Sequence, residues 1–495
     1  MGRVKPLPGR PNVVVVLADD MGWGDPASYG ASIPTPNLDR LAREGVQLTD
    51  AHSSSAVCTP SRYGLLTGRY AWRGPLQRGV LGPHGPALIE PTRPTIASLL
   101  HDAGYATAAF GKWHLGLGWR RRDGTVKNAV GPHAESDIFW DPWGPDVDTG
   151  FDVDYTAPFT GGPLELGFDR FFGIAGSLDM PPYCFLDQDR SLGVPDREKE
   201  HYAPGQRRGL QVAGWQDDQV DVRFVEEAAA WLTERTHREE PFFLYLATSA
   251  PHRPCVPPAF IRGTSGAGPR GDGVCLVDWM VGRLLAVLDQ TATSEDTLVI
   301  VTSDNGATTM FPEDGVPAHA PNGAWRGQKA DAWEGGHREP FFARWPGHIA
   351  PGSLGTGLAC LTDVLPTVAA ATGVALPVGA AEDGLDLGPM LRGDAGPGVD
   401  RCVVHHSNDG VFAVRLGRWK CIFGTGSGGF SAPAGTECGP GDSDGQLYDV
   451  LTDPSESCNR WLEHPEVVAG LHQELLRIRV GSRDAVENAA VDQGD

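Results

Sequence analysis

Four uninterrupted runs of apolar residues, each followed by polar residues, constrain the fold of this chain most. The runs cover residues 12–18, 105–110, 241–247 and 297–301. None of them alternates between apolar and polar positions, so each predicts a strand that is buried on both faces of a sheet. Helical patterns lie between the runs, over residues 36–44, 94–103, 216–235 and 273–288. This alternation predicts an α/β fold with a mostly parallel sheet flanked by helices.

The pattern changes after about residue 390. Short strand-like segments separated by glycine-rich turns cover residues 403–404, 412–415, 419–422 and 446–449, and an amphipathic stretch covers 465–480. We predict a main domain over residues 1–390 and a small α+β subdomain over residues 391–495, built from an antiparallel sheet and one helix. Residues 119–170 are rich in Gly, Pro, Asp and Trp and predict long loops.

The charge of the chain limits its partners. A formal net charge of −22 disfavours binding to nucleic acid and to anionic membranes, so we expect no nucleic-acid partner. No apolar run approaches the ~20 residues of a membrane span. Residues 1–12 show no secretory signal. The prediction is a cytoplasmic protein if the chain is full length, and a periplasmic or secreted one if a signal peptide has been removed.

Polar residues follow each of the four runs, and in a parallel sheet the carboxyl ends of the strands share one edge. Two of these polar groups are rich in oxygen ligands: Asp19 with Asp20, and Asp304 with Asn305. Such a set suits a hard cation, whereas zinc is disfavoured because neither pair brings a His or Cys at ligand spacing. The alternative is that the acidic residues cap the helices that follow.

The segment Cys58-Thr59-Pro60-Ser61-Arg62 leads into an apolar-periodic stretch. A proline near the start of a helix suggests that Cys58 lies at the helix N-terminus, where free N–H groups favour an anion. Taken alone, the segment is also compatible with a buried thiol beside a helix cap.

Together with the continuation to Leu-x-Thr-Gly-Arg, residues 58–69 resemble the signature of type I sulfatases, in which the Cys is oxidised to formylglycine by a generating enzyme. The resemblance continues in order through residues 19–25, 111–116, 249–252, 303–306, 326–329 and 334–340. Within that family the chain is most similar to the arylsulfatase A and N-acetylgalactosamine-6-sulfatase branch. The resemblance implies the alkaline-phosphatase fold, with residues 1–390 as the catalytic domain and a small C-terminal subdomain.

The resemblance also implies a set of site residues. Calcium, less often magnesium, would be bound by Asp19, Asp20, Asp304, Asn305 and the modified Cys58. Arg62 would hold the aldehyde hydrate, and Ser177 would form a hydrogen bond near it. Side chains that bind sulfate oxygens or move protons would be Lys112, His114, His252 and Lys329. Without the resemblance, such a Lys/His pair is more often part of a solvated loop.

The predicted reaction is hydrolysis of a sulfate monoester, on a sulfated carbohydrate from the chain end and also on aryl sulfates. Predicted partners are a sulfated small molecule or saccharide and, during maturation, the formylglycine-generating enzyme. The pocket would be lined by loops of residues 119–170, 179–183 and 405–409. For His405 and His406, the alternative is a structural pair on a strand edge.

Two other functions stay open at this point. One is a phosphonate monoester or phosphodiester hydrolase of the same superfamily. The other is a non-catalytic binding protein on the same scaffold, although every metal and Lys/His position is present. The nine cysteines lack Cys-x-x-Cys spacing, so the eight besides Cys58 would form four disulfides or remain buried thiols.

Overall fold

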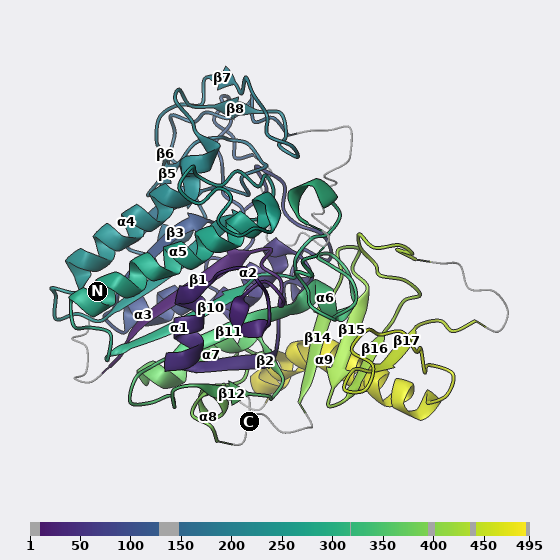
Figure 1. Cartoon of the computed structure of the whole chain (residues 1–495). Coiled ribbons are helices and arrows are strands. Elements are labelled where there is room, and N and C mark those ends of the chain that lie inside the picture. The colour runs from purple at the N-terminus through teal and green to yellow at the C-terminus, as the bar shows by residue number, and fades with distance from the viewer. Residues whose placement is uncertain (1–9, 128–147, 317, 395–400, 436–441, 492–495) are drawn as a thin grey trace.

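The central feature of the computed structural model is an 11-stranded sheet (Figure 1). The structure describes residues 10–127, 148–316, 318–394, 401–435 and 442–491. The strand order is β12-β2-β11-β10-β1-β9-β3-β4-β5-β6, and β13 also pairs with β2.

The middle of this sheet is parallel. Strand β1 (Asn12–Asp19) lies between β10 (Thr297–Ser303) and β9 (Phe242–Pro251), and β9 also pairs with β3 (Ala106–Lys112). These are the four strands expected from the sequence, and all four are confirmed. Strand β3 pairs in parallel with β4 (Arg170–Ile174).

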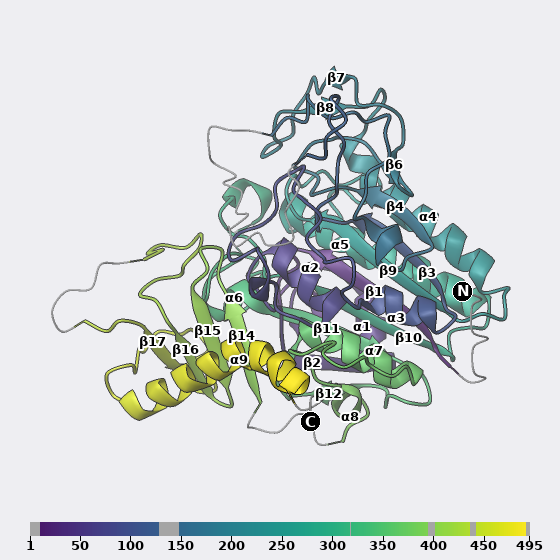
Figure 2. The ribbon, with the colours of Figure 1, turned by 180° about the vertical axis from the view of Figure 1, so that it is seen from behind.

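Helices cover both faces of the sheet, which explains why β1 is apolar at every core position. Val14 and Val16 pack on one face against α1 (Pro36–Glu44), α4 (Val220–Arg235) and α5 (Gly268–Gln290). Val13 and Val15 pack on the other face against α2 (Cys58–Thr67), α3 (Ile96–Asp102) and α7 (Val364–Thr372). Figure 2 shows α2, α3 and α7 from their own side. The four predicted helices are therefore confirmed.

One side of the sheet is mixed, and the sequence did not predict it. Strand β11 (Arg338–Arg344) pairs antiparallel with both β10 and β2 (Val46–His52). Its apolar run is short, and its charged residues are buried: Glu339 is fully covered and Arg338 is 3% exposed. A strand that buries charges does not carry the apolar pattern by which a strand is identified.

The remaining described elements are shorter. The large sheet also contains β5 (Leu186–Asp187), β6 (Arg190–Ser191), β12 (Ser353–Gly355) and β13 (Ala359–Cys360). A separate hairpin joins β7 (Arg197–Glu198) to β8 (Leu210–Gln211). Short helices are α6 (Glu334–His337) and α8 (Gly388–Leu391).

The C-terminal part forms a second, four-stranded sheet in the order β14-β15-β16-β17. The strands are β14 (Cys402–His406), β15 (Phe412–Leu416), β16 (Trp419–Ile422) and β17 (Gln446–Asp449), all antiparallel. Helix α9 (Pro465–Val491) packs on this sheet through Leu471 and Leu475. The predicted α/β class with a small antiparallel sheet and helix is confirmed, whereas the boundary at residue 390 stays a prediction.

The cysteines of the described part of the chain are all free thiols. Most are buried, and Cys458 is exposed. This agrees with the thiol alternative for those residues; Cys438 lies outside the described residues. Of the predicted loops over 119–170, residues 128–147 also lie outside them. In the described ranges, no helix is long and apolar enough to cross a membrane.

Candidate active site

Cys58 is the first residue of α2 and is only 2% exposed. Its Sγ lies 3.5 Å from Asp19 Oδ1 and 3.3 Å from Lys329 Nζ. Burial, together with the charge of Asp304, raises the pKa of the Cys58 thiol well above its ordinary value. An unmodified Cys58 is therefore a protonated thiol at neutral pH and a poor nucleophile.

The four predicted oxygen ligands meet at the carboxyl ends of β1 and β10. Ala18 and Ser303 are in register, so Asp19 and Asp304 follow them side by side. The backbone N–H of Asp20 donates to Asp304 Oδ1 at 3.1 Å, and Asn305 Nδ2 donates to Asp20 Oδ1 at 2.6 Å. None of the four is more than 1% exposed.

The donor set fits a hard cation. Asn305 Oδ1 is a buried carbonyl oxygen that accepts no hydrogen bond from the described residues. One donor atom each from Asp19, Asp20, Cys58 and His252 lies within 4.8 Å of the others. Carboxylate and amide oxygens are the ligands that Ca²⁺ and Mg²⁺ prefer, so these residues could hold such an ion.

Three buried cations balance the carboxylates. Lys112, the last residue of β3, lies 2.7 Å from Asp19 Oδ2, and Lys329 lies 2.8 Å from Asp20 Oδ1. Arg62, one turn along α2 from Cys58, contacts Asp304 at 2.6 Å and Asp19 at 3.2 Å. Burial alone would raise the pKa of Asp19, but Lys112, His252 and Arg62 lower it well below its ordinary value. Asp19 is therefore ionised and available as a ligand.

His114 has one ring nitrogen without a hydrogen-bond partner among the described residues. Its Nε2 lies 3.0 Å from the carbonyl oxygen of Leu81, so Nε2 carries the proton. Its Nδ1 is buried and has no hydrogen-bond partner among the described residues. Burial, Lys112 and Arg62 lower the pKa of His114 well below its ordinary value. The ring is neutral and can accept a proton at Nδ1.

His252 and Ser177 contact each other beside Asp20. Ser177 Oγ is 3.2 Å from His252 Nδ1, and His252 Nε2 is 3.7 Å from Asp20 Oδ2. Ser177 is 2% exposed. The structure thus gathers every residue predicted for the site around Asp19 and Asp20; their individual catalytic roles stay predictions.

One supporting residue was missed by the sequence analysis. Arg270 of α5 donates to both carboxylate oxygens of Asp25, at 2.8 and 2.6 Å, and to the backbone carbonyl of Asp20 at 2.8 Å. It therefore holds the turn from which Asp20 projects. Asp25 belongs to the 19–25 motif, but an arginine near the start of a mostly apolar helix gives no signal that could have identified it.

Two residues predicted to line the pocket belong to the C-terminal sheet. His405 is fully buried and His406 is 1% exposed, both on β14. Their place in the packed interior, with His405 Nδ1 2.9 Å from the backbone carbonyl of Ser53, favours the structural alternative. Within residues 179–183, Tyr183 is 1% exposed, and Asp179 forms an ion pair with Arg207.

Comparison with known proteins agrees with this arrangement. The family model described as Sulfatase matches residues 11–374, which is most of the chain. The chain belongs to the sulfatase family. It is 34% identical over 499 residues to N-acetylgalactosamine-6-O-sulfatase of Bacteroides thetaiotaomicron, covering 95% of this chain and 93% of that protein. It is 33% identical to arylsulfatase A of Homo sapiens, covering 98% of this chain and 91% of the relative.

The chain is also similar in fold to a solved structure. It comes from work on glycosaminoglycan metabolism by Bacteroides thetaiotaomicron and has a TM-score of 0.79 at 30% identity, covering 95% of this chain and 99% of that one. The predicted branch of the family is confirmed by these relatives. This sulfatase is a sulfuric ester hydrolase with the alkaline-phosphatase-like fold.

Proposed function

We propose that this sulfatase removes sulfate from sulfated carbohydrates, with Cys58 converted to formylglycine and with Ca²⁺, or alternatively Mg²⁺, bound at the oxygen ligands. The observation that carries the proposal is the position of Cys58. It lies at a helix N-terminus, with its Sγ 3.5 Å from a carboxylate of the oxygen set and 3.3 Å from a lysine. A nucleophile at this point faces cationic side chains that can hold an anionic ester.

The formylglycine and the cation have separate chemical roles. Formylglycine, once hydrated, would supply two hydroxyls on one carbon. One would be the nucleophile toward sulfur, and loss of the proton from the other would allow sulfate to leave. The cation would be held by Asp19, Asp20, Asp304 and Asn305 and supplies Lewis-acid stabilisation of negative charge.

The remaining steps belong to the side chains of the chain itself. Lys112 and Lys329 bind sulfate oxygens, and Arg62 orients residue 58 through its contacts with Asp19 and Asp304. His252, placed by Ser177, donates a proton to the leaving alcohol oxygen. His114 Nδ1 accepts the proton of a hydroxyl on residue 58, because its lone pair is free and its ring is neutral.

The relative named N-acetylgalactosamine-6-O-sulfatase supports a carbohydrate substrate, since it matches almost the whole of this chain. A direct test compares sulfate release from N-acetylgalactosamine 6-sulfate, its 4-sulfate isomer and a sulfated oligosaccharide. An exo-acting enzyme desulfates the terminal residue of the oligosaccharide alone. Activity on p-nitrophenyl sulfate with none on any sulfated sugar would contradict the carbohydrate assignment.

The formylglycine is tested by mass spectrometry of the peptide that contains residue 58, from protein produced together with a formylglycine-generating enzyme. We expect the aldehyde in active protein, and no turnover by Cys58→Ala. The matched control is Cys275→Ala, a buried thiol of α5 outside the site. Full activity of Cys58→Ala would exclude this residue as the nucleophile.

The cation is tested by removing it. Chelation with EDTA should abolish turnover, and Ca²⁺ or Mg²⁺ should restore it, with the more effective ion identified by its half-saturating concentration. Asn305→Ala should weaken that response, because it removes the buried carbonyl oxygen. Unchanged activity after exhaustive chelation, with metal content measured, would contradict the proposal.

The rival prediction, a phosphonate monoester or phosphodiester hydrolase, is not favoured, because the relatives named above are sulfatases. Comparing kcat/KM for p-nitrophenyl sulfate and for a p-nitrophenyl phosphate diester gives an independent decision. A clear preference for the diester would replace our proposal with the rival.

A further inference from the structure

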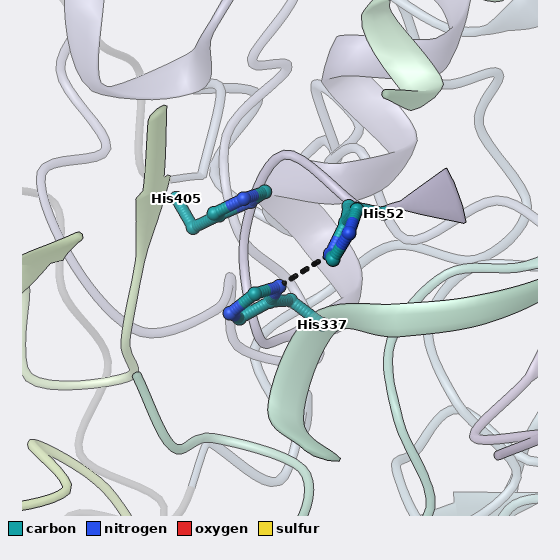
Figure 3. A group of neighbouring side chains, drawn as sticks. All are labelled: His52, His337 and His405. Atoms are coloured by element: carbon teal, nitrogen blue, oxygen red, sulfur yellow. Dashed lines mark hydrogen bonds between the residues drawn. The ribbon is translucent and has the colours of Figure 1, made fainter. Parts of the chain in front are cut away.

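A cluster of three histidines lies where the large sheet meets the C-terminal sheet and shares no residue with the oxygen ligands (Figure 3). His52 ends β2, His337 ends α6 and His405 belongs to β14. All three are fully buried. One ring nitrogen of each lies within 4.8 Å of the others. None of them has a part in the proposed reaction.

The outward nitrogens of two of these rings are already engaged. His52 Nε2 lies 2.8 Å from Asp50 Oδ1, and His405 Nδ1 lies 2.9 Å from the carbonyl oxygen of Ser53. Each of these nitrogens therefore carries the proton, and His52 Nδ1 and His405 Nε2 are left with lone pairs. Metal-binding histidines in proteins are oriented in the same way, by a carboxylate or a backbone carbonyl on the far nitrogen.

The ring nitrogens that face into the cluster do not all have hydrogen-bond partners. His52 Nδ1 lies 3.0 Å from His337 Nδ1, as the dashed line in Figure 3 shows. His405 Nε2 has no hydrogen-bond partner among the described residues, although it is buried. A buried polar atom without a partner is costly and often marks the place of an ion or a water.

Buried charges of both signs surround the cluster. Lys420 Nζ lies 3.0 Å from His337 Nε2, but it also lies 3.2 Å from Glu334 and 3.0 Å from Glu456, both fully buried. Arg338 lies 2.6 Å from Asp50 and 2.8 Å from Glu334, so the carboxylates beside the rings are already paired. Glu334 adjoins the cluster on the side of His52 and Asp50.

We propose that His52, His337 and His405 form a second metal site that binds a borderline transition-metal ion of the Zn²⁺ type, with a fourth position left for water. Three imidazole ligands suit Zn²⁺, whereas the all-oxygen set of the active site suits Ca²⁺ or Mg²⁺. Around a tetrahedral Zn²⁺ the ligand nitrogens lie ~3.3 Å apart, close to the His52–His337 separation.

Binding requires one local change. The rings of His337 and His405 are stacked, with centroids 3.9 Å apart and planes 12° from parallel. The lone pair of an imidazole nitrogen lies in the plane of the ring. Two stacked, parallel rings therefore cannot both coordinate one ion until one of them turns. His337 is the ring that turns, because its two hydrogen-bond partners, His52 and Lys420, are side chains that can move with it, whereas His405 is bonded to the backbone carbonyl of Ser53. After the turn, His337 Nε2 gives up its contact with Lys420 and donates a hydrogen bond to Glu334, whose Oε1 now lies 4.0 Å away.

The site would join two parts of the molecule. His52 and His337 belong to the main domain, and His405 belongs to the C-terminal sheet. An ion bound by all three stabilises their association, because it binds only where the two sheets are packed together. Zinc should therefore raise the unfolding temperature of the full-length protein.

The test uses the whole protein with the active-site ligands saturated by Ca²⁺. After chelation and return of Ca²⁺, ZnCl₂ is added and bound zinc is counted by elemental analysis. Crystals measured at the zinc absorption edge then locate the ion. We expect one zinc per chain between the three rings. An anomalous peak only at Asp19 and Asp20, or no tightly bound zinc, would overturn the proposal.

Variants separate binding from folding. His405→Gln and His337→Gln should each weaken zinc binding at least tenfold and remove the zinc-dependent rise in unfolding temperature. The matched control is His406→Gln, which replaces the adjacent buried histidine of β14 outside the cluster and should retain both properties. If a variant does not fold, the position of the anomalous peak in the wild-type protein decides alone. Equal zinc affinity in all three variants would also overturn the proposal.

Discussion

Lys112 Nζ donates to both carboxylate oxygens of Asp19, at 2.9 and 2.7 Å, and neither side chain is exposed to solvent. The two residues end strands β3 and β1, which are separated in the sheet by β9. The carboxylate that we propose as a cation ligand is thus held ionised by the lysine that we propose as a sulfate-binding residue.

Lys112→Ala should lower kcat/KM by about 100- to 1000-fold, because it removes a positive charge aimed at the sulfate oxygens. It should also lower the free energy of unfolding by about 3–5 kcal/mol in the absence of bound metal, since Asp19 loses its nearest cation. Kinetics on p-nitrophenyl sulfate and denaturant unfolding measure the two effects. Lys127→Ala is the control, because Lys127 pairs with Asp152 in a loop. Near-normal turnover of Lys112→Ala would exclude the substrate-binding role.

His114→Ala should lower kcat by about 100-fold or more, the usual range for loss of a general base. Because His114 is proposed to act on release of sulfate, the peptide containing residue 58 should retain a sulfo group after the variant is mixed with substrate. Rapid quenching and mass spectrometry detect this group. A variant that is slow but never sulfated would show that His114 acts at an earlier step.

Arg270→Met should weaken the activating cation by about 10- to 100-fold, as expected for loss of a residue that orients a metal ligand. Its guanidinium holds the backbone carbonyl of Asp20 and the carboxylate of Asp25. Turnover should recover at high Ca²⁺, because Arg270 does not contact the substrate. Arg283→Met, an exposed arginine of the same helix, should leave the Ca²⁺ response unchanged. A loss of kcat at saturating Ca²⁺ would contradict a purely positioning role.

Asp278 should impose a pH dependence on stability. It accepts hydrogen bonds at 2.9 Å from the backbone N–H groups of Asn37 and Leu38, at the start of α1, and burial raises its pKa from 3.8 to about 6. Between these values the unfolded chain loses the proton first, so the folded state loses stability as pH rises from about 4 to 6.

Asp278→Asn cannot ionise and should not show that loss. The free energy of unfolding of the variant, minus that of the wild type, should therefore rise by up to about 3 kcal/mol between pH 4 and pH 7. Urea unfolding at a series of pH values measures this change. A difference that stays constant over the range would mean that Asp278 titrates normally in the folded protein.

The sequence predicted the central sheet and the metal-ligand pairs for one physical reason. Strands buried on both faces are apolar throughout, and parallel strands bring the residues after them to one edge. Asp19 and Asp304 could therefore be placed together although 285 residues separate them. The same reasoning failed for β11. Its residues Arg338 and Glu339 are buried, and Arg338 forms an ion pair with Glu334, so the strand has no uninterrupted apolar run by which it could be recognised.

The sequence by itself determined which residues end the core strands, and its series of motifs between residues 19 and 340 predicted the family and, through it, the class of reaction. The tertiary structure decided what no local pattern encodes. Packing α5 against β1 brings Arg270 to the turn after Asp20, and joining the two sheets brings His405 to His52 and His337. Such contacts form between segments hundreds of residues apart. Their energy comes from burial and charge pairing in the folded state, so only the folded chain reveals them.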